Sequence, residues 1–424
     1  MRARDFLISL MFLPLTGFSQ EEKDYQTDVT GFIKTDVFWD SRQTVDVRDG
    51  HFLLYPKDEM LDTYGQDINS KSKLSMLSIQ TRLKGIISGP GILGANATGV
   101  IEGAFCGTIN STINSFRLRH AYAKLEWSSS EMIIGQYWHP FFLTSSFPDV
   151  VSFNTGAPFQ PLSRNPQIRF SHNLGDFRAV VTALSQIDFK DAGPNEKLEK
   201  VASAAFLKNS VLPEFNLRVD YEKEDHGNGS ALLLSGAANF KRLMPLTHLV
   251  YNSGKIPMTR KMTGYVDGFS TLACIRYQTR KMTIKLEGIY GQLLYSMTML
   301  GGFGITNMDM DATSDLAYAP VNTSSVWTEL HSNGEKWQGG IFLGYTKNHG
   351  SKDRALINTY SRGDNIENVF RISPRLIHNA GQVRIATELE YTVAAFGAAD
   401  HSGRVHEAKE ISNLRLLVGF YYFL

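Results

Sequence analysis

The chain alternates between apolar and polar residues over runs of about ten residues. Phe215, Leu217, Val219 and Tyr221 are apolar, and the residues between them are Asn, Arg and Asp. The same two-residue period recurs at 77–83, 282–287, 370–376 and 382–391. This period predicts strands with one apolar and one polar face. At ~3.3 Å per residue and ~45° tilt, such a run spans roughly 23 Å, which matches the apolar band of an outer-membrane barrel.

The last stretch of the chain, Asn413–Leu424, shows the pattern most strongly. Its even positions are all apolar or aromatic: Leu414, Leu416, Val418, Phe420, Tyr422 and Leu424. A soluble protein would have to bury such an end, whereas a strand facing lipid leaves it exposed. Paired with the first strand, it would also close a barrel and leave no free edge.

Sixteen segments of the chain carry this strand pattern. They are residues 31–39, 74–86, 95–106, 115–127, 131–138, 166–173, 176–187, 214–223, 230–241, 265–277, 281–294, 324–332, 336–347, 365–376, 382–394 and 412–424. The sequence therefore predicts an all-β fold, a sixteen-stranded antiparallel transmembrane β-barrel. The alternative is eighteen strands, because 201–208 and 246–252 could form one more pair. We interpret 201–208 as a loop segment or a short helix.

The connections between these segments alternate in length. Short ones include 128–130, 173–176, 278–280 and 333–335, and long ones are 40–73, 139–165, 188–213, 242–264, 295–323, 348–364 and 395–411. Bacterial barrels have short periplasmic turns and long outer loops, so the alternation supports the same fold. With both termini periplasmic, the strand count must be even.

The start of the chain has the features of a secretory signal. Arg2 and Arg4 precede an apolar core, Phe6–Leu15, and small residues stand at Gly17 and Ser19. We predict a signal peptide at 1–19, a short periplasmic segment at 20–30 and a barrel at 31–424. No later run of about 18 apolar residues exists, which excludes a helical membrane protein. Two cysteines, Cys106 and Cys274, fall in separate predicted strands, and we expect free thiols.

Several short motifs resemble a known family. Residues 116–124 read Phe-Arg-Leu-Arg-His-Ala-Tyr-Ala-Lys, and 135–138 read Gly-Gln-Tyr-Trp. Residues 212–221 open with Leu-Pro-Glu and carry Arg218 three residues before Tyr221, and 31–36 read Gly-Phe-Ile-Lys-Thr-Asp. Together, and in their order along the chain, these motifs resemble the DcaP-like family of trimeric outer-membrane porins. The resemblance implies a homotrimer in the bacterial outer membrane and dicarboxylate-like solutes.

The polar faces of the predicted strands would line a lumen. Basic residues outnumber acidic ones there by roughly two to one, although the whole chain has a net charge of only +1. A positive lumen concentrates anions, and arginine adds bidentate geometry for carboxylate or phosphate. As pore-lining residues that favour anions we predict Arg117, Arg119, Arg82, Arg169, Arg218, Arg371, Arg375, Arg384, Lys34 and Lys285. The alternative is that these residues pair with lumenal acids and hold the wall.

The sequence thus predicts a porin in the bacterial outer membrane that passes small, anionic, hydrophilic solutes. Its expected partners are outer-membrane lipid, these solutes and further copies of the chain, and no nucleic acid. We expect no enzyme activity, cofactor or metal. The alternative function is an outer-membrane barrel enzyme or a plugged ligand-binding barrel. The loop 139–165, rich in proline and aromatic residues, could narrow the barrel, cap it or contact another subunit.

Overall fold

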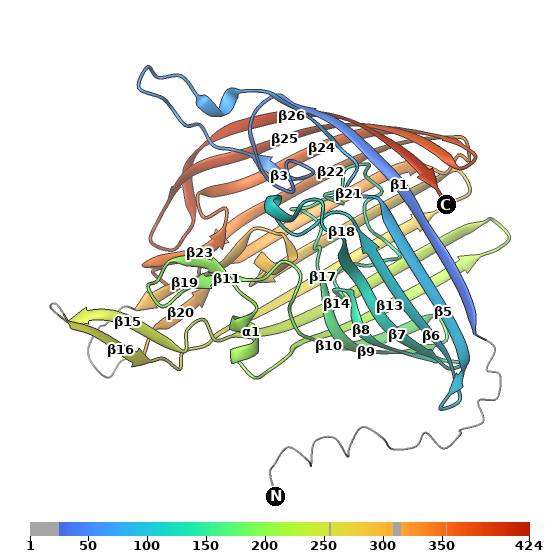
Figure 1. Ribbon diagram of the computed structural model, residues 1–424, viewed down its shortest axis with the longest axis horizontal. Helices are drawn as coiled ribbons and strands as arrows, with labels where there is room; N and C mark the ends of the chain where they lie inside the picture. Colours follow the sequence, from blue (N-terminus) through green and yellow to red (C-terminus); the bar gives the residue numbers. More distant parts are fainter. Residues whose placement is uncertain (1–24, 254–255, 308–314, 353) are drawn as a thin grey trace, which may run out of the picture.

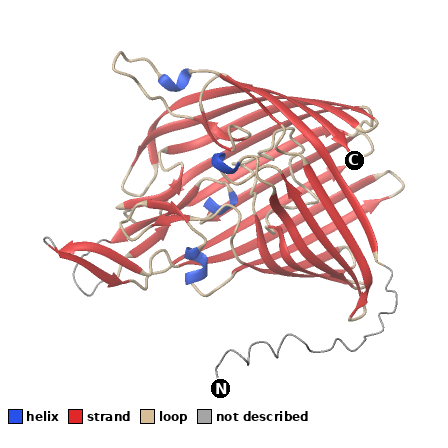
Figure 2. Cartoon of the chain, viewed as in Figure 1, coloured by secondary structure: helices blue, strands red, loops and turns tan. Residues whose placement is uncertain are grey.

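The computed structural model describes residues 25–253, 256–307, 315–352 and 354–424. The predicted signal peptide, 1–19, and residues 20–24 lie outside the described residues. Strands dominate the described chain, and its helices are short (Figure 2). None of these helices is long and apolar enough to cross a membrane.

The strands form one closed antiparallel barrel (Figure 1). Its sheet holds 17 strands, and β4 and β5 follow one another along β1 as a single interrupted strand, so the described residues make a sixteen-stranded barrel. The bounds are β1 Gln26–Asp40, β4 Lys73–Leu77, β5 Arg82–Ile92, β6 Ala95–Ala104, β7 Arg117–Glu126, β8 Ser130–Trp138, β9 Arg164–Leu174, β10 Phe177–Leu184, β13 Glu214–Asp225, β14 Ser230–Leu243, β17 Val266–Gln278, β18 Met282–Gln292, β21 Asn322–Ser332, β22 Trp337–Gly350, β24 Ile366–Ala380, β25 Val383–Ala399 and β26 Val405–Phe423. The predicted count of sixteen is confirmed.

The segments that could have raised the count to eighteen lie in the outer loops. The first, 201–208, overlaps the short helix α1 (Ala205–Asn209). The second lies largely in β15 (His248–Ser253), which pairs with β16 (Ile256–Lys261) in a hairpin that projects from the barrel (Figure 1). The remaining small strands also belong to outer loops: β2 Thr44–Val47, β3 Phe52–Pro56, β11 Ala192–Pro194, β12 Lys200–Ala202, β19 Gly301–Asn307, β20 Ala317–Pro320 and β23 Asn358–Arg362.

Several strand boundaries differ from the prediction, and the predicted strand 74–86 is interrupted and ends at Ile92. The first strand begins at Gln26, where it pairs with Ser88 of β5, rather than at 31. The long connection expected at 395–411 is wrong, because β25 and β26 extend on either side of it and leave only 400–404 between them. The residues involved include many polar ones, and these strand ends lie beyond the segment with lipid-type alternation, so the two-residue apolar pattern does not reveal them.

The last strand closes the barrel, as its pattern predicts. β26 pairs with β1 from Phe423 opposite Phe32 to Arg415 opposite Asp40. Leu416, Val418 and Phe420 on its outer face are each more than 40% exposed. The intervening side chains point inward and are buried. Cys106 and Cys274 are both buried free thiols, as expected.

A charge on this outer face should destabilise the barrel. We expect Val418→Arg to lower the free energy of unfolding by about 2–4 kcal/mol, because the guanidinium would face the lipid in the middle of the apolar run 414–422. The matched control is His406→Arg at the water-exposed start of the same strand, where we expect about 0–1 kcal/mol. Urea unfolding in lipid vesicles measures both, and equal losses would contradict the assignment of the lipid face.

Candidate functional site

The loop between β8 and β9, residues 139–163, lies inside the barrel and is called the crossing loop below. It bonds to strands around the wall. Lys285 of β18 donates to the carbonyl oxygen of Phe147 at 2.8 Å. Glu388 of β25 accepts from the backbone N–H of Ser152 at 2.9 Å. Of the alternatives left open for this loop, the structure shows entry into the lumen.

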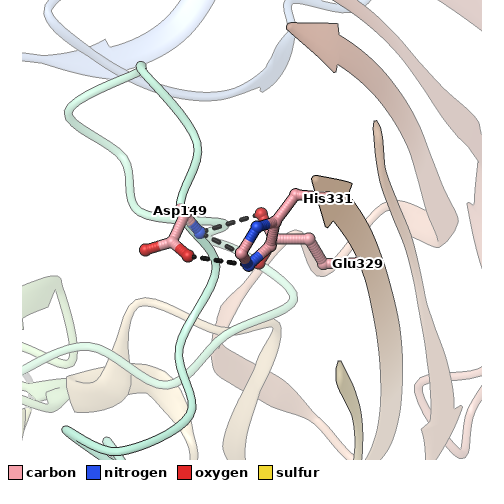
Figure 3. Close-up of side chains that lie close together, drawn as sticks. All are labelled: Asp149, Glu329 and His331. Carbon is pink, nitrogen blue, oxygen red and sulfur yellow. Dashed lines mark hydrogen bonds and ion pairs between the residues drawn. The ribbon is translucent and has the colours of Figure 1, made fainter. Parts of the chain in front are cut away.

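The tip of the crossing loop is held by a charged cluster (Figure 3). The backbone N–H of Asp149 donates to the carboxylate of Glu329 at 2.9 Å, and the Asp149 carboxylate lies 3.2 Å from Nε2 of His331. The ammonium of Lys285 bonds both carboxylates, at 2.7 Å and 2.9 Å. Arg375 also pairs with Glu329.

This cluster is the one group of potential metal ligands among the described residues, with Asp149, Glu329 and His331 donor atoms within 4.8 Å of one another. Lysine already occupies the position between the two carboxylates that a cation would take. Two basic side chains therefore neutralise two acidic ones. The arrangement fits an anchor for the crossing loop better than a metal centre.

Several other predicted lumen residues anchor the same loop through its backbone. Lys34 donates to the carbonyl of Val151 at 2.9 Å, and Arg218 to that of Pro140 at 2.9 Å. Arg371 donates to the carbonyl of Ala157 at 2.8 Å. These charged hydrogen bonds attach the backbone of the loop to β1, β13 and β24. The loop is consequently a fixed partition across the barrel.

A hairpin of the first outer loop covers the crossing loop. The hairpin is formed by β2 and β3, and its residues Phe52 and Leu54 are fully or nearly fully buried. Arg371 donates to the carbonyl of Leu54 at 2.8 Å as well as to the crossing loop. His51 stacks on Phe153 with ring centroids 4.5 Å apart. Burial lowers the pKa of His51 to about 4, so this ring is neutral at pH 7.

Beside the crossing loop lies a cavity of about 480 Å³. Its lining includes Gln338 and Tyr421 near the short-turn ends of β22 and β26, and Phe32, which pairs with Phe423, so the cavity extends toward the periplasmic side. Among the described residues, six arginines line it and one carboxylate, that of Asp149. The arginines are Arg48, Arg82, Arg119, Arg164, Arg375 and Arg384.

Acidic partners of these arginines stand behind the cavity wall. Glu102 lies 2.7 Å from Nε of Arg119 and 3.4 Å from Nε of Arg82. Asp188 lies 3.1 Å from Arg164. Since the carboxylates neutralise only part of the basic charge, the cavity keeps a positive excess. Low-dielectric walls strengthen the field of such an excess on a small solute.

The structure separates the predicted pore-lining residues into two groups. Four of them line the cavity: Arg82, Arg119, Arg375 and Arg384. The other six bond the crossing loop, the wall or a neighbouring loop: Arg117, Arg169, Arg218, Arg371, Lys34 and Lys285. Sequence reasoning missed two lining arginines. Arg48 lies in an outer loop without periodicity, and Arg164 precedes Pro166, where the predicted strand began.

No family model and no curated protein sequence matches the chain. Solved structures do. The outer membrane channel DcaP of Acinetobacter baumannii is 13% identical, with a TM-score of 0.63 over 94% of this chain and 97% of that one. The anion-selective porin from Comamonas acidovorans is 11% identical, with a TM-score of 0.54 over 95% of this chain and 100% of that one. OmpT, an outer membrane protein of Vibrio cholerae, is 11% identical, with a TM-score of 0.52 over 94% and 98%.

At these identities the likeness concerns the fold. The chain has the fold of outer-membrane porins, and the resemblance seen in the sequence motifs holds at that level. The closed barrel and its exposed apolar outer face place the protein in the bacterial outer membrane.

The anchor at the loop tip should contribute strongly to stability. We expect Lys285→Met to cost about 3–5 kcal/mol, because it leaves the carboxylates of Asp149 and Glu329 without their shared ammonium. Lys347→Met is the control, since its pair with Glu367 is partly exposed and worth under about 1 kcal/mol. Urea unfolding followed by gel mobility compares the two. Equal losses would show that the crossing loop does not depend on this anchor.

Proposed function

We propose that this protein is a porin through which small anionic, hydrophilic solutes cross the outer membrane. The observation that carries the proposal is the cavity beside the crossing loop, where six arginines face one carboxylate. A narrow passage lined by one sign of charge favours permeation by the opposite sign. The fold it shares with a channel and with an anion-selective porin supports the same function.

The arginines that line the cavity differ in whether an acidic partner already neutralises their charge. Arg384 donates to the side-chain oxygen of Asn379 at 2.8 Å and lies over the rings of Tyr421 and Phe423. It has no ion pair with a described carboxylate. Arg375 and Arg119, by contrast, each pair with a glutamate. Arg384 is therefore a lining arginine whose charge should act directly on a passing anion.

The subunits would assemble as a homotrimer. This part of the proposal rests on the resemblance of the sequence motifs to a family of trimeric porins. Outer-membrane lipid would surround the trimer. The enzyme alternative is not favoured by structural neighbours that are a channel, a porin and an outer membrane protein.

A plugged, ligand-binding barrel is the second candidate function. The observation behind it is the apolar packing of the β2–β3 hairpin and the crossing loop inside the barrel, where Phe52, Phe153 and Phe159 are buried together. The two candidates differ in one measurement, the conductance of the folded protein in a planar bilayer. Stepwise conductance in groups of three supports a trimeric porin, whereas a folded barrel without conductance supports the plug.

Charge reversal in the cavity should change ion selectivity. In a bilayer under a potassium chloride gradient, we expect the unaltered protein to give a reversal potential on the anion side. Arg384→Glu should lower the anion-to-cation permeability ratio by about threefold or more, because it replaces an attractive charge in the passage by a repulsive one.

The matched control for this prediction is Arg242→Glu. Arg242 pairs with Asp267 at the outer end of β14 and does not line the cavity. Its replacement makes the same change in net charge and should leave the permeability ratio nearly unaltered. Equal permeability of anions and cations in the unaltered protein would refute the anion preference.

A further inference from the structure

One corner of the cavity contains more positive charge than its acids neutralise. Asp188 accepts from Arg164 at 3.1 Å and lies 3.4 Å from Nη1 of Arg117. Arg48 and Arg117 both donate to the carbonyl oxygen of Gly107, each at 3.1 Å. Three guanidinium groups thus share one carboxylate. The corner keeps a surplus of about two positive charges at neutral pH, because arginine stays protonated.

Several donors that line the cavity lack acceptors. Arg48 and Arg164 are each only 1% exposed, and Ser152 is 4% exposed. Among the described residues, Nη1 and Nη2 of Arg48, Nη1 of Arg164 and Oγ of Ser152 have no hydrogen-bond partner. All three side chains line the cavity. Leaving buried charged donors unmatched is unfavourable, so the group of donors points to an acceptor that binds there.

The guanidinium of Arg48 is held in place by aromatic rings rather than by acids. It lies 5.2 Å from the centroid of Phe153, 5.6 Å from that of Phe189 and 5.9 Å from that of Phe52. These contacts position the group without neutralising it. Its backbone has a φ of 58°, a conformation that arginine rarely adopts. The fold therefore keeps an arginine, with both terminal nitrogens available, at a strained turn.

The number of donors and the charge define the ligand class. Two guanidinium groups and a hydroxyl offer more hydrogen bonds than the two oxygens of one carboxylate can accept. A phosphate group has three or four acceptor oxygens and a charge of about −1.5 to −2 at pH 7, which matches the surplus. We propose that Arg48, Arg164 and Ser152, which line the same cavity, together bind a dianionic tetrahedral oxyanion, either inorganic phosphate or the phosphate group of a phosphomonoester.

This proposal rests on the proposed function and deepens it, since it names the class of solute that the same cavity binds. Calorimetry on the detergent-solubilised full chain tests it. Inorganic phosphate, glycerol phosphate and succinate are titrated separately. We expect phosphate to bind at least about tenfold more tightly than succinate, whose two charges are separated. Succinate binding as tight as phosphate would overturn the proposal. Glycerol phosphate distinguishes the sources: comparable binding shows that the site accepts esters, and its failure restricts the site to the free anion.

Variants locate the binding site. Ser152→Ala removes one hydroxyl and leaves intact the backbone N–H that bonds Glu388, and we expect about threefold to tenfold weaker phosphate binding. Arg48→Met should weaken it by about tenfold or more. Arg242→Met at the outer rim is the control and should bind phosphate as the unaltered protein does. Arg48 is buried and its variant could fail to fold, so Ser152→Ala provides the decisive result. Unaltered phosphate affinity in Ser152→Ala would overturn this placement of the site.

The outcome is separable from that of the proposed function. Anion-side reversal potentials together with no phosphate binding would leave the porin and remove the phosphate site. Phosphate binding by a barrel that conducts no ions would remove diffusion and leave the phosphate site in a plugged barrel.

Discussion

Closure of the barrel is the constraint on which the rest of the structure depends. A strand edge within lipid would leave unpaired N–H and C=O groups, each at a cost of several kcal/mol. The pairing of β26 with β1 removes that edge along the run from Phe423 to Arg415. Once the wall is closed, outer side chains must suit lipid, and polar side chains can only turn inward or reach water. The inward charge of the lumen is therefore a direct consequence of the closed wall.

The inward charged residues fall into two groups, those that bond the crossing loop and those that face the cavity beside it. Residues such as Lys34, Lys285 and Arg371 bond the backbone or carboxylates of the loop, and they hold a partition across the barrel. Arginines on one side of the partition, such as Arg82 and Arg384, face a cavity. The first group is structural, and because its charges are neutralised by their partners, it adds little to the electrostatic potential of the cavity. The second group keeps a positive excess, which is what a passing or binding anion would meet.

Outer loops that are distant in sequence from the crossing loop contribute residues to the cavity. The β2–β3 hairpin brings Arg48 against Phe153 of the crossing loop and Phe189 of another loop. The same hairpin packs its apolar residues Phe52 and Leu54 against the crossing loop. One loop thus supplies both a charge of the cavity and part of the apolar packing inside the barrel. A cavity that depends on such a loop differs from an open pore whose wall alone sets selectivity.

The sequence by itself determined the wall of the barrel. Alternation along strands such as 215–221 and 413–424 reflects the boundary between lipid and lumen, which acts on every residue of a strand locally. Strand ends beyond the lipid, as at 395–411, lack that boundary and were missed. Only the tertiary structure decided which inward arginines face the cavity and which hold the loop, because that depends on where residues 139–163 cross the barrel. Arg48 shows the limit most clearly: its neighbours Phe153 and Phe189 are more than a hundred residues away, and no local pattern encodes such contacts.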